Sequence, residues 1–395
     1  MTATSAITLY GATGFTGRLV AEYLAQTYPE LPIALAGRSR DKLQRVRTDL
    51  GLGDDVPLVV ADAADPHALR RMTEATRCVV TTVGPYQLHG EALVAACAET
   101  GTDYADLSGE PAWMVDTVAG YADAARASGA RIVHSCGFDS VPFDMGVYFL
   151  QSHARERFGR PCTTVRGRVR AMRGTFSGGT AASFAESVRR AKSDPEVLGW
   201  LKDPFALTPG FSGPAQPSGL EPLYEDDLAS WAAPFIMAGI NTKNIHRSNF
   251  LLDHLYGTDF TYSEMMLTGD GEAGRKRAEA MRNPQAMLAK DPPAPGEGPS
   301  LEERENGFYD ILFVGETERG ERLRVGVSGK RDPGYGSTSR MIGECALALV
   351  QGDPDGRPLD TPGGIYTPAP AFGDTLIARL EAAEVMRFRV EDQSS

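Results

Sequence analysis

Hydrophobic and polar positions follow two alternating rhythms over the first 140 residues of the chain. Short apolar runs, typical of buried strands, are separated by longer stretches whose apolar residues recur at helical spacing. Such alternation of strand and helix is typical of a doubly wound parallel sheet, so we predict an α/β domain over residues 1–145. The predicted strands cover 6–10, 32–37, 57–61, 78–83, 103–106 and 131–135, and the predicted helices cover 16–27, 40–50, 66–74, 89–99 and 115–128.

The pattern changes after the first domain. Residues 165–171 alternate arginine with small or apolar residues, which predicts a strand with one solvated face, although the arginines could also hold an anion. Segments 203–228 and 286–300 are rich in Pro and Gly and predict long loops. We expect a second, α+β domain over 146–340 and a C-terminal segment, 341–395, that returns to the first domain. The remaining predicted elements are helices at 178–192, 340–350 and 372–383 and strands near 308–315 and 322–329.

Length and charge narrow the class of protein. A chain of 395 residues is too long for one ordinary domain, and its 42% hydrophobic residues suffice for a substantial core. The net charge of −12 argues against nucleic-acid binding, which needs a basic face. Five cysteines without CxxC spacing predict neither a disulfide framework nor a zinc site, and we expect no metal.

The sequence predicts a cytoplasmic protein. Its N-terminus lacks the basic and apolar regions of a signal peptide, and no apolar run approaches the ~18 residues of a membrane-spanning helix. The longest apolar patch, 231–238, is short and contains Pro234, so it leaves only peripheral membrane contact open. A homodimer formed through the sheet of the second domain is also left open.

Three glycines, Gly11, Gly14 and Gly17, directly follow the first apolar run and precede an amphipathic stretch. In a strand–turn–helix context, the first glycine permits the tight turn, the second allows a pyrophosphate to approach, and the third lets the helix pack on the strand. The loop therefore predicts a Rossmann-type dinucleotide site; a glycine-rich turn that only packs the helix is the alternative. The loop residues assigned to the cofactor are Gly11, Thr13, Gly14, Phe15, Thr16 and Gly17.

The residues after the second predicted strand favour NADP over NAD. An NAD site usually has an acid here to bond the ribose 2′-hydroxyl, whereas this chain has Arg38 and Ser39. A guanidinium suits the 2′-phosphate because it donates paired, charge-assisted hydrogen bonds. We assign Arg38, Ser39 and Lys42 to the cofactor, although Arg40 and Lys42 could instead decorate a solvated helix start.

Further cofactor contacts are expected after the third and fourth predicted strands, because ligands of parallel sheets bind beyond the carboxyl ends of the strands. Asp62 could accept the adenine amino group or cap the next helix. Gly84 leaves room for the cofactor and Pro85 fixes the turn. Tyr86 could line the pocket, donate a proton or pack in the core.

Short motifs spread along the chain carry a family resemblance. They lie at 11–17, 36–39, 83–86, 101–110, 137–144, 177–180, 241–242, 247–249, 332–336 and 363–369. Together they resemble the saccharopine dehydrogenase-like oxidoreductases and, within that family, the trans-acting enoyl reductases. The similarity covers nearly the whole chain; the N-terminal motifs are shared by the wider family and the later ones narrow it.

The resemblance implies an NADP-binding Rossmann domain, a second α+β domain, and reduction of a carbon–carbon double bond in a long lipid or polyketide chain. The substrate would then be a lipid-like small molecule made by a separate synthase, with which the protein would make contact. Two alternatives stay open: a saccharopine-type dehydrogenase acting on a C–N bond, and a lipid-associated protein that binds NADP without turnover.

The lining of the substrate cavity discriminates between these alternatives. Phe, Met, Ile and Leu from 205–260 would favour a lipid, whereas two or more arginines would favour an amino acid. An exposed apolar patch near 231–240 would favour the binding protein. The sequence itself shows no cluster of cations of the kind that an amino-dicarboxylate needs.

Enoyl reduction needs hydride delivery to the β-carbon, a donor to the carbonyl, and a proton for the α-carbon. Our catalytic candidates are Tyr86, Asp139 and Ser140, because the loops after the fourth and sixth predicted strands lie on the cofactor side of the sheet. Asp139 could instead cap the helix that begins near residue 142. Three further candidate donors are Tyr104, Ser135 and His134, of which His134 is more typical of a core position.

Two further groups of polar residues have structural as well as functional interpretations. Asp103, Asp106 and Glu110 form an acidic cluster, which after a strand more often makes loop hydrogen bonds and caps than a metal site. Residues 177–180 expose backbone N–H groups at a predicted helix start, where they could hold a carbonyl or phosphate or serve only as a cap.

Overall fold

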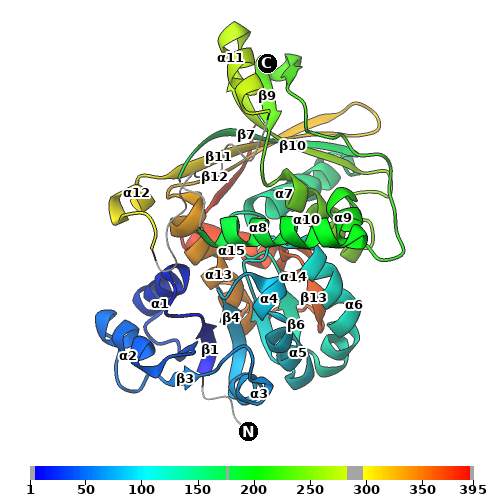
Figure 1. Ribbon diagram of the computed structural model, residues 1–395. Coiled ribbons are helices and arrows are strands. Elements are labelled where there is room, and N and C mark those ends of the chain that lie inside the picture. Colours follow the sequence, from blue (N-terminus) through cyan, green and yellow to red (C-terminus); the bar gives the residue numbers. More distant parts are fainter. Residues whose placement is uncertain (1–4, 175–177, 283–296, 392–395) are drawn as a thin grey trace.

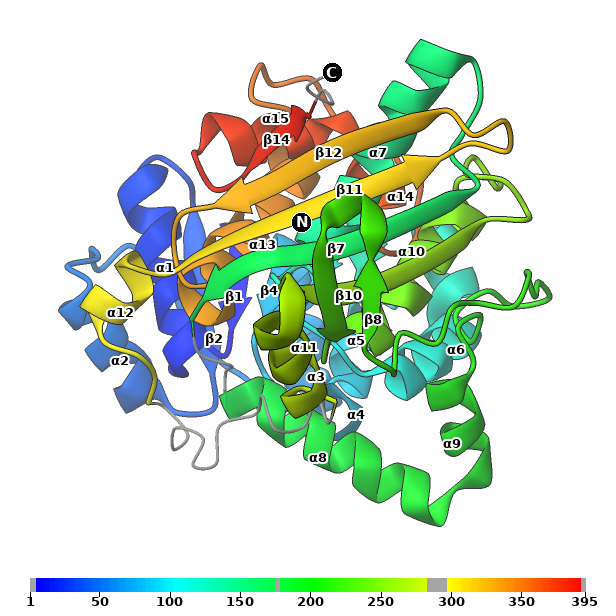
Figure 2. The ribbon, with the colours of Figure 1, turned by 90° about the horizontal axis from the view of Figure 1, so that it is seen from above.

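Two seven-stranded sheets organise the protein, with a layer of helices between them (Figure 1). The computed structural model describes residues 5–174, 178–282 and 297–391. In Figure 2 the long strands of the second sheet cross above the first sheet. No helix within the described ranges is long and apolar enough to cross a membrane.

The first sheet is parallel throughout, with the strand order β13-β6-β5-β4-β1-β2-β3. This order confirms the predicted doubly wound Rossmann-type sheet. Its strands are β1 (Ser5–Tyr10), β2 (Ile33–Gly37), β3 (Leu58–Val60), β4 (Thr76–Thr81), β5 (Asp103–Ala105), β6 (Arg131–Val133) and β13 (Gly364–Tyr366). Its helices are α1 (Phe15–Thr27), α2 (Arg40–Asp49), α3 (Pro66–Glu74), α4 (Tyr86–His89), α5 (Glu91–Thr100), α6 (Pro111–Ser128) and α13 (Thr338–Gln351).

The second sheet is mixed, with the order β14-β12-β11-β7-β10-β9-β8, and only β7 and β10 pair in parallel. It confirms the expected α+β region. Its strands are β7 (Thr164–Arg173), β8 (Leu223–Glu225), β9 (Ser230–Pro234), β10 (Thr261–Gly269), β11 (Phe308–Glu316), β12 (Arg322–Gly329) and β14 (Arg387–Val390). The helices around it are α7 (Val141–Phe158), α8 (Gly178–Ser193), α9 (Pro195–Lys202), α10 (Ala238–Leu251), α11 (Gly271–Ala280), α12 (Leu301–Glu305), α14 (Pro368–Phe372) and α15 (Asp374–Ala382).

Helix α7 joins the two sheets through an aromatic core. Phe143 lies edge-on to Phe138 below it and to Phe313 of β11 above it. One turn further along α7, a Cβ added at Gly146 would lie 2.4 Å from the Phe313 ring. The absence of a side chain at Gly146 therefore lets α7 pack directly on the second sheet.

The alternation in β7 produces two faces of opposite character. Val165 and Val169 are fully buried against the helices. The arginines occupy the other face, where Arg166 pairs with Asp227, and Arg168 is 2% exposed and pairs with Glu225. The expectation of a solvated face is therefore wrong at Arg168, because residues from the 203–228 excursion cover it. Carboxylates of the chain itself occupy the positions where an external anion was considered.

Two other expectations change in the second region. The apolar patch 231–238 is not exposed: Ala232 and Ala233 are fully buried in β9, and Phe235 is 3% exposed. This finding removes the observation on which peripheral membrane contact and the binding-protein alternative rested. Most of the loop predicted at 286–300 lies outside the described residues. The C-terminal segment contributes β13 to the first sheet but β14 to the second, so the expected domain boundaries stay a prediction.

Candidate functional site

The glycine loop forms a cradle in which Gly11 and Gly17 leave no room for a side chain. Gly11 has a φ of +92°, and its carbonyl accepts a hydrogen bond from the Gly14 N–H (2.9 Å). A Cβ at Gly17 would lie 2.2 Å from the Gly11 oxygen, so α1 packs on the loop through a bare backbone. Gly14 precedes α1 without a side-chain cap, which leaves the first N–H groups of the helix available to an anion.

The other loop residues divide between solvent, cavity and packing. Thr13 is exposed, whereas Thr16 lines a cavity that the second region helps to form. Phe15 packs edge-on against Tyr335, with ring centroids 5.0 Å apart, and the Arg304 guanidinium lies 5.8 Å from the centroid of its ring. Phe15 thus joins the loop to α12 and to the turn that follows β12, a contact that the sequence did not indicate.

The residues after β2 include Arg38, a cation without a partner among the described residues. Arg38 is exposed and has no hydrogen bond or ion pair with any described residue. Ser39 caps α2 by accepting from the Lys42 N–H (3.4 Å), and the Lys42 side chain is exposed. Asp62 accepts from the Ala64 N–H, while Asp65 caps the next helix, so the capping role considered for Asp62 is wrong.

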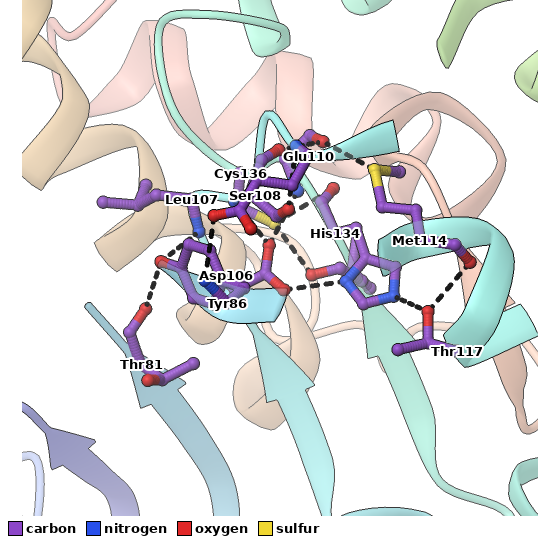
Figure 3. A network of polar contacts seen from close by, with 12 residues as sticks. Thr81, Tyr86, Asp106, Leu107, Ser108, Glu110, Met114, Thr117, His134 and Cys136 are labelled. Atoms are coloured by element: carbon purple, nitrogen blue, oxygen red, sulfur yellow. Dashed lines mark hydrogen bonds and ion pairs between the residues drawn. The ribbon is translucent and has the colours of Figure 1, made fainter. Parts of the chain in front are cut away.

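The turn after β4 is held in place by carboxylate and phenol groups (Figure 3). A cis peptide joins Gly84 to Pro85, and Glu110 then accepts from the N–H groups of Tyr86 (2.8 Å) and Gln87 (2.9 Å). The Tyr86 hydroxyl donates to the Thr81 carbonyl (3.2 Å) and accepts from the backbone N–H of Leu107 (3.1 Å), which follows β5. Burial holds the pKa of Tyr86 well above its usual range. The ring lines the cavity, but its hydroxyl already serves to position the turn.

A buried Asp–His pair fixes the neighbouring turns after β5 and β6 (Figure 3). Asp106 Oδ2 lies 2.7 Å from His134 Nδ1, and His134 Nε2 lies 3.1 Å from the Thr117 hydroxyl. Asp106 Oδ1 accepts from the N–H groups of Ser108 and Ser135, and Ser135 has a φ of +64°. These contacts confirm the loop-bonding interpretation of Asp106 and the core position of His134. The described residues contain no group of three potential ligands that could hold a metal.

Asp139 and Ser140 are adjacent in sequence but face different surroundings. Asp139 lines the cavity, and burial raises its pKa to about 6 against the opposing effect of a hydrogen bond with Thr180. Ser140 is 1% exposed; its hydroxyl donates to Asn241 (3.0 Å) and accepts from Asn244 (2.8 Å) of α10. The structure therefore places Asp139 with Tyr86 at the cavity and Ser140 in the interior behind it.

One cavity of about 330 Å³ connects the cofactor loops to the second region. The Rossmann wall comprises the turns after the first, fourth, fifth and sixth strands, and the opposite wall comes from one face of α8 with the ends of α9 and α10. The Rossmann wall includes Thr16, Gly84, Tyr86, Leu107, Gly137 and Asp139. The opposite wall includes Thr180, Ser183, Phe184, Val188, Leu201, Ile236, Met237, Ile240 and Lys243.

The sequence analysis missed most of the opposite wall. The i, i+3, i+4 spacing of Thr180, Ser183 and Phe184 could have indicated which face of the predicted helix points inward. Ser177, at the proposed start of that helix, lies outside the described residues. Lys243 carried no local signal, because it lies on α10, a helix that was not predicted.

Comparison with known proteins agrees with this architecture. Residues 7–133 match the family model described as the saccharopine dehydrogenase NADP binding domain. The structure is similar to apo saccharopine dehydrogenase (L-Glu forming) from Saccharomyces cerevisiae, with a TM-score of 0.55 at 13% identity over 98% of this chain and 100% of that chain. This likeness concerns the fold alone.

Sequence similarity extends over nearly the whole length of two bacterial relatives. The chain is 43% identical to a putative trans-acting enoyl reductase of Mycobacterium tuberculosis, over 96% of each chain. It is 39% identical to a trans-acting enoyl reductase of Mycobacterium ulcerans, again over 96% of each. The glycine cradle, the uncapped start of α1 and the free Arg38 fit the NADP that the family model implies. The chain therefore belongs to the trans-acting enoyl reductases, NADP-dependent oxidoreductases of the saccharopine dehydrogenase family.

Proposed function

We propose that this protein uses NADPH to reduce the carbon–carbon double bond of a long-chain acyl substrate that a separate synthase produces. The observation that carries the proposal is the cavity that runs from the cofactor loops to a largely apolar wall. This wall includes the apolar residues Ile236, Met237 and Ile240. They belong to segment 205–260, in which an apolar lining favours a lipid substrate over an amino acid. The names of the full-length relatives support the same reaction.

The polar content of the cavity argues against an amino-dicarboxylate substrate. Recognition of two carboxylates needs several converging cations, and arginine is the usual choice. No arginine lines the cavity in the described ranges, and Lys243 is its one basic residue there. An acyl chain with one carbonyl matches this lining better than saccharopine does.

The residues of the chain divide the work of the reaction. The bound cofactor supplies the hydride. The glycine loop and the start of α1 hold the pyrophosphate, with Thr13, Phe15 and Thr16 at its borders, and Gly84 and Pro85 leave space beside the nicotinamide. Arg38, Ser39 and Lys42 bind the 2′-phosphate, and Asp62 faces the adenine.

Asp139 is the proton source in this scheme. Its pKa of about 6 leaves a protonated fraction near neutral pH, and the group lies at the cavity rather than behind it. Tyr86 positions the turn after β4 because both of its hydroxyl contacts are made to backbone. Ser140 lies behind the cavity wall, where its hydroxyl is hydrogen-bonded to Asn241 and Asn244 and so helps to position α10.

NADPH oxidation by purified protein tests the proposal. The substrates are α,β-unsaturated acyl thioesters of increasing chain length, with the saturated thioesters and saccharopine as controls. We expect turnover only with the unsaturated thioesters, with NADPH preferred to NADH, and a rate that falls at least about 100-fold in Asp139→Asn. Oxidation of saccharopine, or tight NADPH binding without turnover of any enoyl thioester, would contradict the proposal. The expected synthase contact, cytoplasmic location and homodimer stay predictions.

A further inference from the structure

Lys243 is a buried cation without a buried counterion. The residue is 4% exposed, and its ammonium donates to the carbonyl oxygens of Leu201 (2.9 Å) and Gly239 (3.0 Å). Among the described residues it forms no ion pair; the acid that acts on it is the exposed Asp203, and His246 lies near it on the same helix. An ammonium has three N–H groups, so one donor is left for a ligand.

The surroundings make this arrangement unfavourable unless a ligand uses it. Leu201, Ile236 and Met237 line the same cavity and offer no charge. Removing an ammonium from water costs several kcal/mol unless hydrogen bonds and an opposite charge compensate it. Two carbonyl groups supply only part of that compensation.

Helix α8 relates the acid to the turn that would border the nicotinamide. Thr180 is hydrogen-bonded to Asp139. Ser183 stands beside Gly84, since a Cβ built there would lie 3.7 Å from the serine oxygen. Three residues separate these two contacts, which corresponds to about 4–5 Å along a helix. The proton source proposed above is therefore one helical turn from the turn that borders the nicotinamide.

Lys243 lies on α10, the helix that binds the residue next to Asp139. The Ser140 hydroxyl is bonded to Asn241 and Asn244, which flank Lys243 on that helix. Asp139 and Lys243 both line the cavity. Because the α-carbon and the carbonyl carbon of an acyl group are adjacent, one substrate in this cavity can present its α-carbon to Asp139 and its carbonyl oxygen to Lys243.

We propose that Lys243 is a catalytic residue whose free N–H donates to the carbonyl oxygen of the unsaturated acyl substrate and stabilises the enolate. This inference rests on the enoyl reduction proposed above. Hydride adds two electrons to the β-carbon; the former double-bond pair forms the enolate, with its negative charge on the carbonyl oxygen. The enolate collapses as Asp139 gives its proton to the α-carbon, which leaves the saturated acyl group. A cation already in place and shielded from water favours this charge without reorganisation.

Kinetics of Lys243→Met, Lys243→Arg and the matched control Lys202→Met test this role. Lys202 is an exposed lysine of α9, next to the carbonyl that holds Lys243. With the trans-dodecenoyl thioester of N-acetylcysteamine, Lys243→Met is expected to lower kcat about 100- to 1000-fold with little change in KM. Lys243→Arg should retain part of kcat, and Lys202→Met should match the wild type.

Two controls separate this role from structural or specificity roles. NADPH affinity and the melting temperature of Lys243→Met should be no lower than those of the wild type, because an apolar chain replaces a buried charge. A parallel loss of stability and kcat would overturn the proposal in favour of a structural lysine. A raised KM with unchanged kcat would overturn it in favour of recognition of a permanent anion.

A binding experiment separates this inference from the proposed function. Dodecanoate, whose carboxylate mimics the charged oxygen, is titrated into the NADP⁺ complexes of wild type and Lys243→Met. We expect at least about tenfold weaker binding by the variant. Equal binding overturns the role of Lys243 even if the enzyme reduces enoyl thioesters. If the wild type binds dodecanoate through Lys243 but oxidises no NADPH, the proposed function fails and the catalytic role fails with it.

Discussion

The two walls of the cavity are built in different ways. The Rossmann wall consists of backbone turns held by buried side chains: Asp106 and Glu110 together accept four hydrogen bonds from backbone N–H groups. On the opposite wall, α8 has no buried residue. In Figure 2 this helix runs along the edge of the molecule, outside the second sheet.

The contrast indicates that the Rossmann wall is fixed more firmly than the opposite wall. Glycine backbone and buried carboxylates leave little freedom in the cofactor wall. The substrate wall meets it through a few side-chain bonds, of which Ser183 to Glu110 (2.6 Å) and Gln87 to Ser187 (3.2 Å) are two. We therefore expect that substitutions in α8 can change the cavity without disturbing the turns that we propose for NADP binding.

Gly17→Ala should break the cofactor wall and gives the largest expected effect. Its new Cβ would lie 2.2 Å from the Gly11 carbonyl oxygen, so the loop and α1 must separate. We expect a loss of roughly 3 kcal/mol in unfolding free energy and no measurable NADPH binding. Urea denaturation and fluorescence titration measure both. Gly120→Ala in α6 is the control: no heavy atom lies within 4 Å, so it should stabilise by up to about 1 kcal/mol.

Glu264→Gln tests the interior behind the substrate wall through pH. Glu264 accepts from Asn241 (2.8 Å) and Tyr262 (2.6 Å), and burial raises its pKa to about 8. Because the folded pKa exceeds the unfolded one, the native state holds a proton from about pH 4.5 to about pH 8, and stability falls as pH rises through that range.

The glutamine variant lacks this titration. From pH 6 to pH 9 the wild type should therefore lose up to about 3 kcal/mol relative to Glu264→Gln. Unfolding free energies at the two pH values measure the difference. Glu279→Gln, at an exposed site of α11, should titrate like the wild type. If Glu264→Gln also does so, Glu264 is not the group responsible.

Arg38→Ala sharpens the assignment of the cofactor. Arg38 is exposed and uncommitted among the described residues, so its loss should leave the fold intact. We expect NADPH to bind about 10- to 100-fold more weakly while NADH affinity hardly changes, since only NADPH carries the 2′-phosphate. Fluorescence titration with both cofactors decides this. Arg45→Ala, on the exposed side of α2, should change neither affinity.

Ser183→Ala addresses the link between the walls and has the smallest expected effect. It removes the hydrogen bond to Glu110 but leaves the two backbone bonds of that carboxylate in place. Stability should fall by about 1 kcal/mol, NADPH affinity should hold, and KM for the acyl substrate should rise. Ser193→Ala, at the exposed end of α8, is the control. A loss of NADPH affinity in Ser183→Ala would show that the walls are not independent.

The sequence by itself determined the cofactor half. Each βα unit can be recognised from a short stretch of sequence, because a buried strand, a turn residue and an amphipathic helix follow one another within about 30 residues. The glycine loop, Arg38 and the strand-end positions of Tyr86 and Asp139 could therefore be recognised from the sequence, and the structure places Tyr86 and Asp139 in the lining of one cavity.

Only the tertiary structure decided which polar groups face the cavity and which hold it in shape. Asp139 and Ser140 are neighbours in sequence, yet one lines the cavity and the other binds α10. Glu110 meets Ser183 across 73 positions of the chain. Lys243 reaches the same cavity from a helix that gave no local signal. Periodicity reports local conformation, whereas burial, partners and charge balance depend on contacts between distant segments, which exist only once the chain has folded.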